Sequence, residues 1–383
     1  MKQIFHCLIK VLSPVHIGCG EVYEPTGFVV NEQKKEMTVF DPFKFIGELS
    51  EVDKERLMAI CQGGSAASIL EVYKFFRNKP AAGNQIKLCN GFLKHYSATL
   101  SMSVKDRRRI QQELNNFSIH RTAFLSGSDM PFLPGSSVKG SLRTALLNLR
   151  QKSSPVRQDN REKNASVKLE EKLLNYTKLE EDPFRLVKVS DFMPAGTVKR
   201  KVIYAVDVKK KPGSELGAYQ IVEAVMPGAL FWGSVVIDEA IKGSGIQKPI
   251  RLKELMESAK EFYETENRRE NTELNNAGCQ AFNVGRPDAF LLRVGRHSGA
   301  ECVTIKDHRD IRIMRGKSSP LFLDHATTFW LGAAEKKPQS VSGLIPFGWV
   351  EIVKISEADF NQYRNAPVIS DTNSMGAQNT VSS

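Results

Sequence analysis

Residues 131–150 read PFLPGSSVKGSLRTALLNLR, a loop of proline, glycine and serine that leads directly into a helix. Lys139, Arg143 and Arg150 are spaced so that they lie along one stripe of this helix. A neighbouring face is apolar, because five residues recur at helical spacing: Val138, Leu142, Ala145, Leu146 and Leu149. The stretch therefore predicts a helix that packs one face into a core and presents cations beside it.

The start of this helix has the features of an anion site. Ser136 or Ser137 is the expected N-cap, and neither serine is followed three residues later by Glu or Gln. Without a capping box we expect the first backbone N–H groups to be open. Open N–H groups at the positive end of the helix dipole, next to cations, favour a bound anion.

The anion is not predicted to be a nucleoside triphosphate. The phosphate-binding loop of ATPases and GTPases has its lysine directly after the second glycine, whereas here Lys139 precedes Gly140. The whole chain of 383 residues has 54 Lys and Arg against 43 Asp and Glu, a formal charge of +11. Such an excess favours a polyanion such as nucleic acid as the partner.

Composition also bounds the other classes of function. No run of eighteen apolar residues occurs, so we expect no membrane span and no membrane partner. The first seven residues, MKQIFHC, are too polar for a signal peptide. The six cysteines form no C-x-x-C pair, which favours reduced thiols in a cytoplasmic protein. We expect no metal site and no cofactor.

Three further stretches contain spaced glycines or clustered cations. Residues 13–20 form a loop with two spaced glycines after the first strand, and residues 295–299 read GRHSG. Lys199, Arg200 and Lys201 form a cationic triplet next to a strand-like segment. With a second cationic triplet at 209–211, the first brackets one strand-like arm, which indicates contact with a phosphate backbone.

The coarse order of elements predicts the fold class. The main predicted elements are a strand at 4–12, a helix at 137–150, a strand at 185–192, a hairpin at 219–237, a helix at 251–270 and a strand at 289–294. This is the β-α-β-β-α-β order of ferredoxin-like, α+β folds, which the RNA-recognition fold shares. Loops 13–20, 134–140 and 295–299 would then converge on one edge of the sheet. Residues 301–305 and 349–355 are the last predicted strands.

Four motifs in this order resemble a known family. They are LSPVHIGCGE at 12–21, FLPGSSVKGSLRTAL at 132–146, DPFRLVKVSD at 182–191 and EAVMPGALF at 223–231. Together they are similar to the repeat-associated mysterious proteins (RAMPs), subunits of CRISPR effector complexes. Within that superfamily the resemblance is to subunit five of the type III-A Csm complex, and the PGSSxKGxxR element is its most specific part.

The resemblance implies a discontinuous, ferredoxin-like RAMP palm over residues 1–365. Its core segments would be 4–40, 131–150 and 184–305. Thumb and lid insertions would lie at 42–130 and 151–182, a C-terminal extension at 306–365 and a disordered tail at 366–383. The chain would cap the 3′ end of the guide RNA (crRNA) on a filament of backbone subunits and support its 3′ maturation in antiviral defence. Its partners would be the crRNA, target RNA, other Csm subunits and the host nucleases that trim the guide.

The resemblance also assigns residues. By motif position, the guide backbone would be contacted by Gly135, Ser136, Ser137, Lys139, Gly140 and Arg143. His16, Gly18 and Gly20, with Arg296 and His297 in the second glycine loop, would form supporting loops.

A catalytic role is not expected. The backbone subunit of these complexes cuts target RNA with an aspartate in an early loop, whereas residues 13–25 contain Glu21 and Glu24 but no Asp. Asp41 and Asp129 are better explained as capping or turn residues. The alternatives are a metal-independent endoribonuclease that processes repeat RNA through His16 and His297, and a scaffold that contacts only protein.

Overall fold

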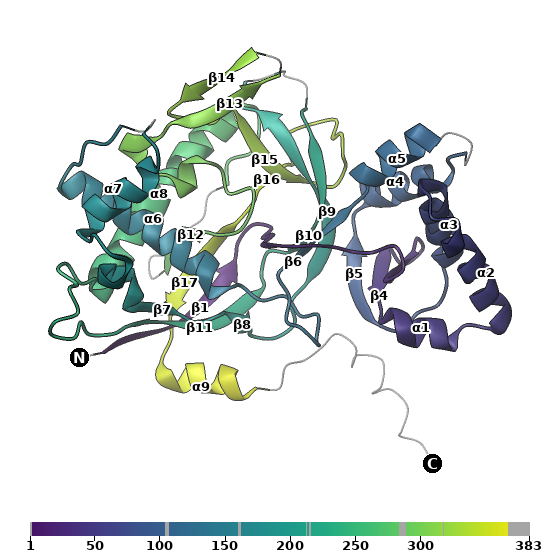
Figure 1. The fold of residues 1–383 in the computed structure, drawn as a ribbon, viewed down its shortest axis with the longest axis horizontal. Helices are drawn as coiled ribbons and strands as arrows, with labels where there is room; N and C mark the ends of the chain where they lie inside the picture. Colours follow the sequence, from purple (N-terminus) through teal and green to yellow (C-terminus); the bar gives the residue numbers. More distant parts are fainter. Residues whose placement is uncertain are drawn as a thin grey trace.

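The computed structural model describes residues 2–103, 107–159, 162–211, 213, 216–282, 289–316 and 318–366. The chain is a mixed α/β protein with two curled sheets and a separate β-hairpin (Figure 1). The predicted tail at 366–383 lies outside the described residues, apart from residue 366. Within the described part, no helix has the length and apolar character needed to cross a bilayer.

The first sheet is antiparallel and is built around the N-terminal strand. Its order is β12-β17-β1-β11-β7, and β8 also pairs with β11. The strands are β1 (Gln3–Val11), β7 (Val187–Val189), β8 (Met193–Pro194), β11 (Leu230–Ile237), β12 (Ala289–Arg293) and β17 (Trp349–Lys354). Alternate residues of β1 are buried, as period-2 alternation requires: Phe5, Cys7, Ile9 and Val11.

Two helices cover one face of this sheet. They are α6 (Gly135–Ser153) and α8 (Leu252–Asn276), and α7 (Ala165–Leu174) packs beside α6. The predicted apolar face of α6 is confirmed, because Val138, Leu142, Ala145 and Leu146 are all fully buried. Deleting such a buried leucine side chain typically costs about 2–5 kcal/mol. The packing of α6 therefore fixes where its first turn lies relative to the sheet.

The second sheet adjoins the first where β1 ends. Its order is β2-β6-β10-β9-β5-β4-β3, and β15 adds to β9 and pairs with β16. The strands are β2 (Gly18–Val22), β3 (Phe28–Asn31), β4 (Glu36–Val39), β5 (Asn84–Leu88), β6 (Ile119–Thr122), β9 (Arg200–Lys209), β10 (Tyr219–Val225), β15 (Thr328–Ala333) and β16 (Ile345–Pro346).

Five helices pack at the outer end of this second sheet, on the right of Figure 1. They are α1 (Pro42–Glu48), α2 (Glu51–Gln62), α3 (Ala66–Phe76), α4 (Asn90–Leu100) and α5 (Arg107–Asn116). Asp41 caps α1, since its carboxylate accepts from the N–H groups of Phe43 and Lys44. The capping role predicted for Asp41 is therefore confirmed.

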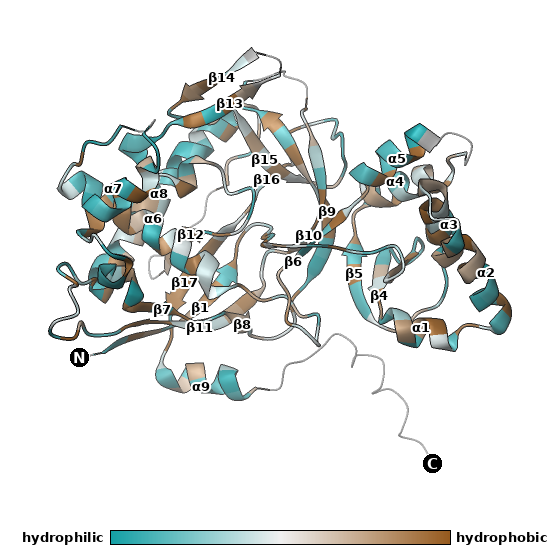
Figure 2. Cartoon of the chain, in the orientation of Figure 1, coloured by the Kyte–Doolittle hydropathy of each residue, from teal (hydrophilic) through white to brown (hydrophobic). Residues whose placement is uncertain are grey.

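The remaining elements lie at the periphery of the sheets. The hairpin β13 (Ile311–Arg315) and β14 (Ser318–Leu323) projects from the molecule, and Figure 2 shows apolar residues along it. Helix α9 (Glu357–Asn365) packs on the other face of β1 and β11, where Phe360 contacts His6 and Trp232. The short 3-10 helices are η1 (Leu179–Glu181), η2 (Pro183–Arg185), η3 (Glu301–Val303) and η4 (Lys306–His308).

Three sequence predictions are wrong in detail. The segment 219–237 is not one hairpin in one sheet, because the backbone turns at Gly228 (φ +93°) and sends β10 and β11 into different sheets. The β-α-β-β-α-β order made 289–294 the fourth strand of the sheet, but β17 is the strand that pairs with β1, and β12 lies one place further out. The strand predicted at 301–305 is η3, with Glu301 and Cys302 buried against α8.

Candidate nucleic-acid interface

The two glycine loops predicted from the sequence contact each other. The N–H of Arg296 donates to the carbonyl of His16 at 2.8 Å. Gly295 has a φ of +83°, and a Cβ there would lie 2.5 Å from the same carbonyl oxygen. Only glycine fits such an approach without displacing backbone. Of the three loops predicted to converge, 13–20 and 295–299 therefore contact each other and are defined here as the loop cluster. The third, 134–140, is instead bonded to the segment around β7, through Val187 and Asp191.

Two histidines lie within the loop cluster, His16 buried and His297 partly buried. The rings of His16 and His297 stack with centroids 6.2 Å apart, and the Nδ1 of His16 is hydrogen-bonded to the carbonyl of Glu223 at 2.8 Å. Burial, with a smaller contribution from the charge of Arg296, lowers the pKa of His16 to about 4. Burial and the neighbouring His16 lower the pKa of His297 to about 3. Both imidazoles are neutral at pH 7.

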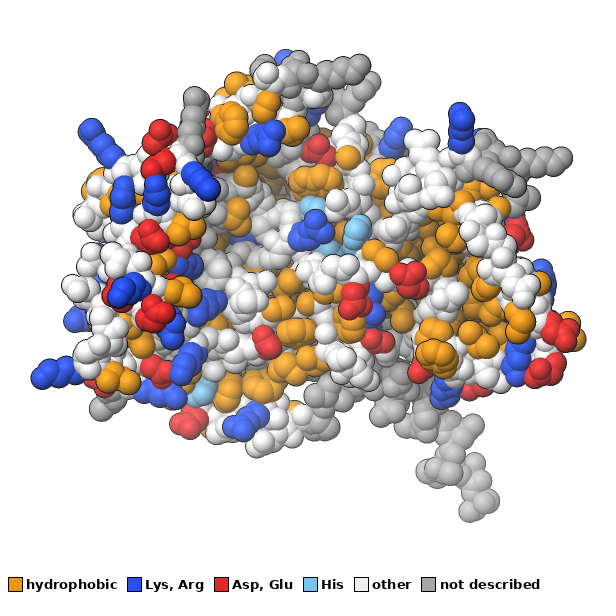
Figure 3. All heavy atoms as spheres, viewed as in Figure 1, with side chains coloured by type: hydrophobic (Ala, Val, Ile, Leu, Met, Phe, Trp, Pro, Cys, Tyr) orange, Lys and Arg blue, Asp and Glu red, His pale blue; other side chains and the backbone are white. Residues whose placement is uncertain are grey.

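Arg296 is the exposed cation of the loop cluster. A Cβ at Gly18 would lie 2.8 Å from Cδ of Arg296, so the arginine side chain lies directly across this glycine. Gly20 has open space around it. Among the described residues, no carboxylate forms an ion pair with the Arg296 guanidinium. Figure 3 shows His side chains next to a Lys or Arg side chain near the centre of the visible face, beside a hollow.

The start of α6 differs from the predicted anion site. The N-cap is Pro134 and not Ser136 or Ser137. The N–H of Gly135 is not open, because it donates to the carboxylate of Asp191 at 2.7 Å. Ser136 and Gly140 are exposed, and the N–H of Ser137 donates to the Pro134 carbonyl at 2.9 Å. An acidic side chain of this chain thus occupies the place expected for a ligand oxygen.

Two of the cations of α6, Lys139 and Arg143, are bound within the protein. Lys139 donates from Nζ to the carbonyl of Val187 at 2.8 Å, and burial lowers its pKa. Arg143 bonds to Glu170 at 2.7 Å and to Asp182 at 3.1 Å. A phosphate could reach Arg143 only by competing with two carboxylates. Contact of this stretch with RNA stays a prediction.

The triplet at 199–201 divides into buried and accessible members. Arg200 forms an ion pair with Glu223 at 2.9 Å, and their side chains are only 8% and 1% exposed. Its Nη1 also donates to the carbonyl of Asp129 at 3.0 Å. Lys199 and Lys201 have no such ion pair within the described residues, and all three residues of the triplet line an open groove of about 670 Å³. Sequence reasoning missed the other lysines of that groove, namely Lys34, Lys35 and Lys87.

Glu223 connects the loop cluster to the neighbourhood of this groove. Its carbonyl holds His16, one carboxylate oxygen accepts from Arg200, and the other accepts from the N–H of Thr122 at 3.1 Å. One residue of β10 therefore positions both regions.

Other candidate positions have structural partners. Asp129 forms an ion pair with Arg121 at 3.0 Å and lies in a turn with a φ of +53°, as expected for a turn residue. Within the described residues, no group of three or more His, Cys, Asp or Glu side chains is arranged to hold a metal ion.

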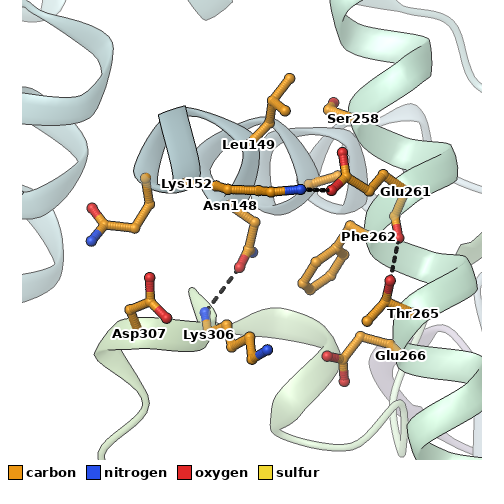
Figure 4. Close-up of a pocket in the computed structure, with 12 residues that line it drawn as sticks. Asn148, Leu149, Lys152, Ser258, Glu261, Phe262, Thr265, Glu266, Lys306 and Asp307 are labelled. Atoms are coloured by element: carbon orange, nitrogen blue, oxygen red, sulfur yellow. Dashed lines mark hydrogen bonds and ion pairs between the residues drawn. The ribbon is translucent and has the colours of Figure 1, made fainter. Parts of the chain in front are cut away.

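A separate pocket of about 360 Å³ lies between α6, α8 and η4 (Figure 4). Figure 4 shows Lys152 and Glu261 pointing toward each other across it, and the N–H of Lys306 donates to Asn148 at 2.9 Å. None of the residues predicted to contact RNA lines this pocket.

Comparison with known proteins gives a family and a fold. The sequence model of the RAMP superfamily matches residues 8–296. No curated protein sequence matches the chain. The fold is similar to a chain of the cryo-EM structure of a Csm–crRNA–target RNA ternary complex of a type III-A CRISPR-Cas system. The TM-score is 0.61 at 19% identity, covering 91% of this chain and 100% of that chain. It is also similar to the crystal structure of T. onnurineus Csm5. There the TM-score is 0.50 at 17% identity, covering 90% of this chain and 99% of that chain.

Proposed function

This chain belongs to the RAMP superfamily, and on that premise we propose that it is a guide-RNA-binding subunit of a type III-A CRISPR (Csm) ribonucleoprotein. The superfamily resemblance inferred from the four motifs is confirmed by the family model. One solved structure of similar fold is a subunit of a complex with crRNA and target RNA, and another is a Csm5. These likenesses support a role in antiviral defence within the cytoplasm.

The observation that carries the proposal is the exposed guanidinium of Arg296. It lies over Gly18, which has no side chain, and Arg296 is exposed. Arginine binds phosphate through a planar pair of N–H donors, and glycine neighbours let a sugar-phosphate backbone come close. The loop cluster can therefore hold an RNA backbone without reading its sequence.

The proposed architecture is a ferredoxin-like palm formed by part of the first sheet. Strands β17-β1-β11-β7 are all antiparallel, and α6 and α8 pack on one face. Counting β1, β7, β11 and β17 as strands 1, 2, 3 and 4 gives the order 4-1-3-2, which supports this assignment. The helices α1–α5 would then belong to the insertion at 42–130, and α7 to the insertion at 151–182.

Within the complex, we place the chain at the 3′ end of the crRNA, next to the backbone subunit of the filament. There it would end the filament, contact target RNA and give the trimming nucleases access to the guide. The proposed role is non-catalytic. General acid–base cleavage of RNA needs one protonated and one neutral group at the scissile phosphate. His16 and His297 are both neutral at pH 7 and have lowered pKa values.

The test is RNA crosslinking in the assembled complex, purified with the wild-type chain or with Arg296→Ala. We expect crosslinks at residues 16–20 and 295–299 in the wild type, and weaker guide retention in the variant. Arg364→Ala is the matched control, since Arg364 is an exposed arginine on α9. A complex that holds its guide equally well with Arg296→Ala would refute the site. Absence of any RNA crosslink to this chain would favour the protein-only scaffold.

A further inference from the structure

The lysines of the groove lined by Lys199 and Lys201 come from three segments far apart in the sequence. The turn between β3 and β4 contributes Lys34 and Lys35, and β5 contributes Lys87. Residues 197–201, at the start of β9, contribute the remaining lysines. Because these segments meet only through the pairing of β4, β5 and β9, the groove is a property of the folded sheet. We call these five lysines the groove lysines.

Strand register arranges part of the groove in a row. Glu36 of β4 is directly opposite Lys87 of β5, and Lys87 is directly opposite Lys201 of β9. Neighbouring strands are about 4.8 Å apart, so the three side chains cross roughly 10 Å of sheet on one face. Lys34 and Lys35 extend this row at the exposed tip of the adjacent turn.

Most of the charge in the groove is not neutralised. Glu36 is paired with Lys87, and Arg200 is paired with Glu223. Lys34, Lys35, Lys199 and Lys201 form no ion pair with any residue that the structure describes. Four cations around a groove of about 670 Å³ repel one another and attract a chain of negative charges.

The lining favours nucleic acid over an acidic protein. Its apolar members are Leu88 and Met226, and it includes no aromatic residue. A stable protein interface needs apolar or aromatic anchors at its centre, whereas a phosphate backbone needs only cations and polar groups. Because contacts from lysine to phosphate carry no sequence information, binding there would be independent of sequence.

We infer that the groove lysines bind the phosphate backbone of a single-stranded RNA segment that continues beyond the loop cluster. This inference rests on the proposed function, because Glu223 joins the two regions and one strand would occupy both. Each uncompensated lysine neutralises one phosphate. The groove therefore contributes affinity only to RNAs long enough to reach it.

The test uses the full-length chain and single-stranded RNAs of increasing length. In the groove variant, Lys34, Lys35 and Lys199 are replaced by alanine. In the control variant, Lys94, Lys188 and Lys253 are replaced, whose side chains are 75%, 68% and 85% exposed. Both variants lose three charges, and exposed substitutions of this kind leave stability nearly unchanged. A third variant with arginine at the three groove positions keeps the charge.

We expect wild type, control and arginine variant to bind long RNAs more tightly than short ones. Single-stranded RNA gives a slope of about −0.7 per phosphate contact in a plot of log affinity against log salt. In the groove variant, the loss of three contacts should therefore make the slope shallower by about 2 and lower the affinity for long RNAs roughly 100-fold at 0.1 M salt. Binding of short RNAs should not change.

The outcomes separate this inference from the proposed function. In one outcome, the affinity of the groove variant still rises with RNA length and keeps its salt slope, while Arg296→Ala lowers the affinity for RNAs of every length. The groove assignment is then wrong, and the loop cluster is supported as the RNA site. If the groove variant keeps RNA but fails to join other subunits, the groove is a protein-binding surface and the inference is wrong. If the wild-type chain binds no RNA of any length, both fail.

Discussion

The buried ion pair between Arg200 and Glu223 offers a direct test of how this chain uses its cations. The two side chains are 8% and 1% exposed and 2.9 Å apart. Removing one partner leaves an uncompensated buried charge, which typically costs about 3–5 kcal/mol. Arg200→Met and Glu223→Gln should each lower the free energy of unfolding by that amount. Gln at 223 keeps an acceptor for the N–H of Thr122.

In the double variant, the free energy of unfolding should fall by much less than the sum of the decreases in the two single variants. With both charges gone, no charge is left unpaired, so the expected coupling is about 2–3 kcal/mol. Urea unfolding, followed by tryptophan fluorescence, measures all four proteins. RNA binding at low temperature supplies the second readout. Because Arg200 is engaged with Glu223 and Asp129, Arg200→Met should leave the salt slope of RNA binding unchanged.

Two results would contradict this reasoning. Single variants that unfold within 1 kcal/mol of wild type would mean that the pair is solvated and contributes as little as a surface ion pair. A salt slope lowered by about 0.7 in Arg200→Met would mean that Arg200 contacts a phosphate, as the sequence alone predicted.

Three further predictions concern backbone contacts, pH and chemistry. Gly135→Ala places a Cβ 2.4 Å from the Val189 carbonyl and 2.6 Å from that of Ser190, so it should destabilise the chain by about 1–3 kcal/mol. A Cβ at Gly140 would have no atom within 4 Å, so Gly140→Ala should stabilise α6 by up to about 1 kcal/mol. Thermal unfolding in which the Tm of both variants shifts in the same direction would contradict this. His16 and His297 have folded pKa values of about 4 and about 3 against 6.5 in an ordinary histidine. The unfolded chain therefore binds protons more readily, and the free energy of unfolding should fall as the pH drops from about 6.5 toward 3. His16→Gln with His297→Gln should flatten that fall in acid titrations monitored by circular dichroism, and an unchanged profile would show that other groups cause it. Repeat RNA incubated with the pure chain, with and without EDTA, should stay intact, and cleavage lost in His16→Ala or His297→Ala would establish the endoribonuclease instead.

The core elements could be predicted because their signals are local. The apolar face of α6 and the alternation along β1 follow from residue spacing alone, and both are present in the structure. The close approach of loops 13–20 and 295–299 could also be predicted from the sequence, since both loops contain spaced glycines. Periodicity cannot choose between sheets, however. Residues 219–225 and 230–237 both look like strands, but β10 pairs with β6 and β9 whereas β11 pairs with β1 and β7, and the partners β6 and β1 are distant in sequence.

Whether each cation is paired with a carboxylate or free could not be predicted, because its partners are distant in sequence. Arg143 has the spacing expected of a phosphate ligand, yet Glu170 and Asp182 lie 27 and 39 residues further on and bind it. The groove lysines show the opposite case. Lys34 and Lys35 belong to an ordinary polar turn, and only the pairing of β4 with β5 and of β5 with β9 brings them near Lys199.

These cases together indicate where the excess charge of this chain acts. A cation on a helix face or in a strand interior meets side chains from neighbouring elements, and the fold provides a carboxylate for Arg143 and for Arg200. A cation at a glycine-bounded loop or a turn tip has no such neighbours, because the adjacent positions have no side chain or point into solvent. The formal charge of +11 therefore does not spread evenly over the basic residues. Part of the free charge lies at Arg296, Lys34, Lys35 and Lys199, which form no ion pair within the described residues and leave room for a phosphate.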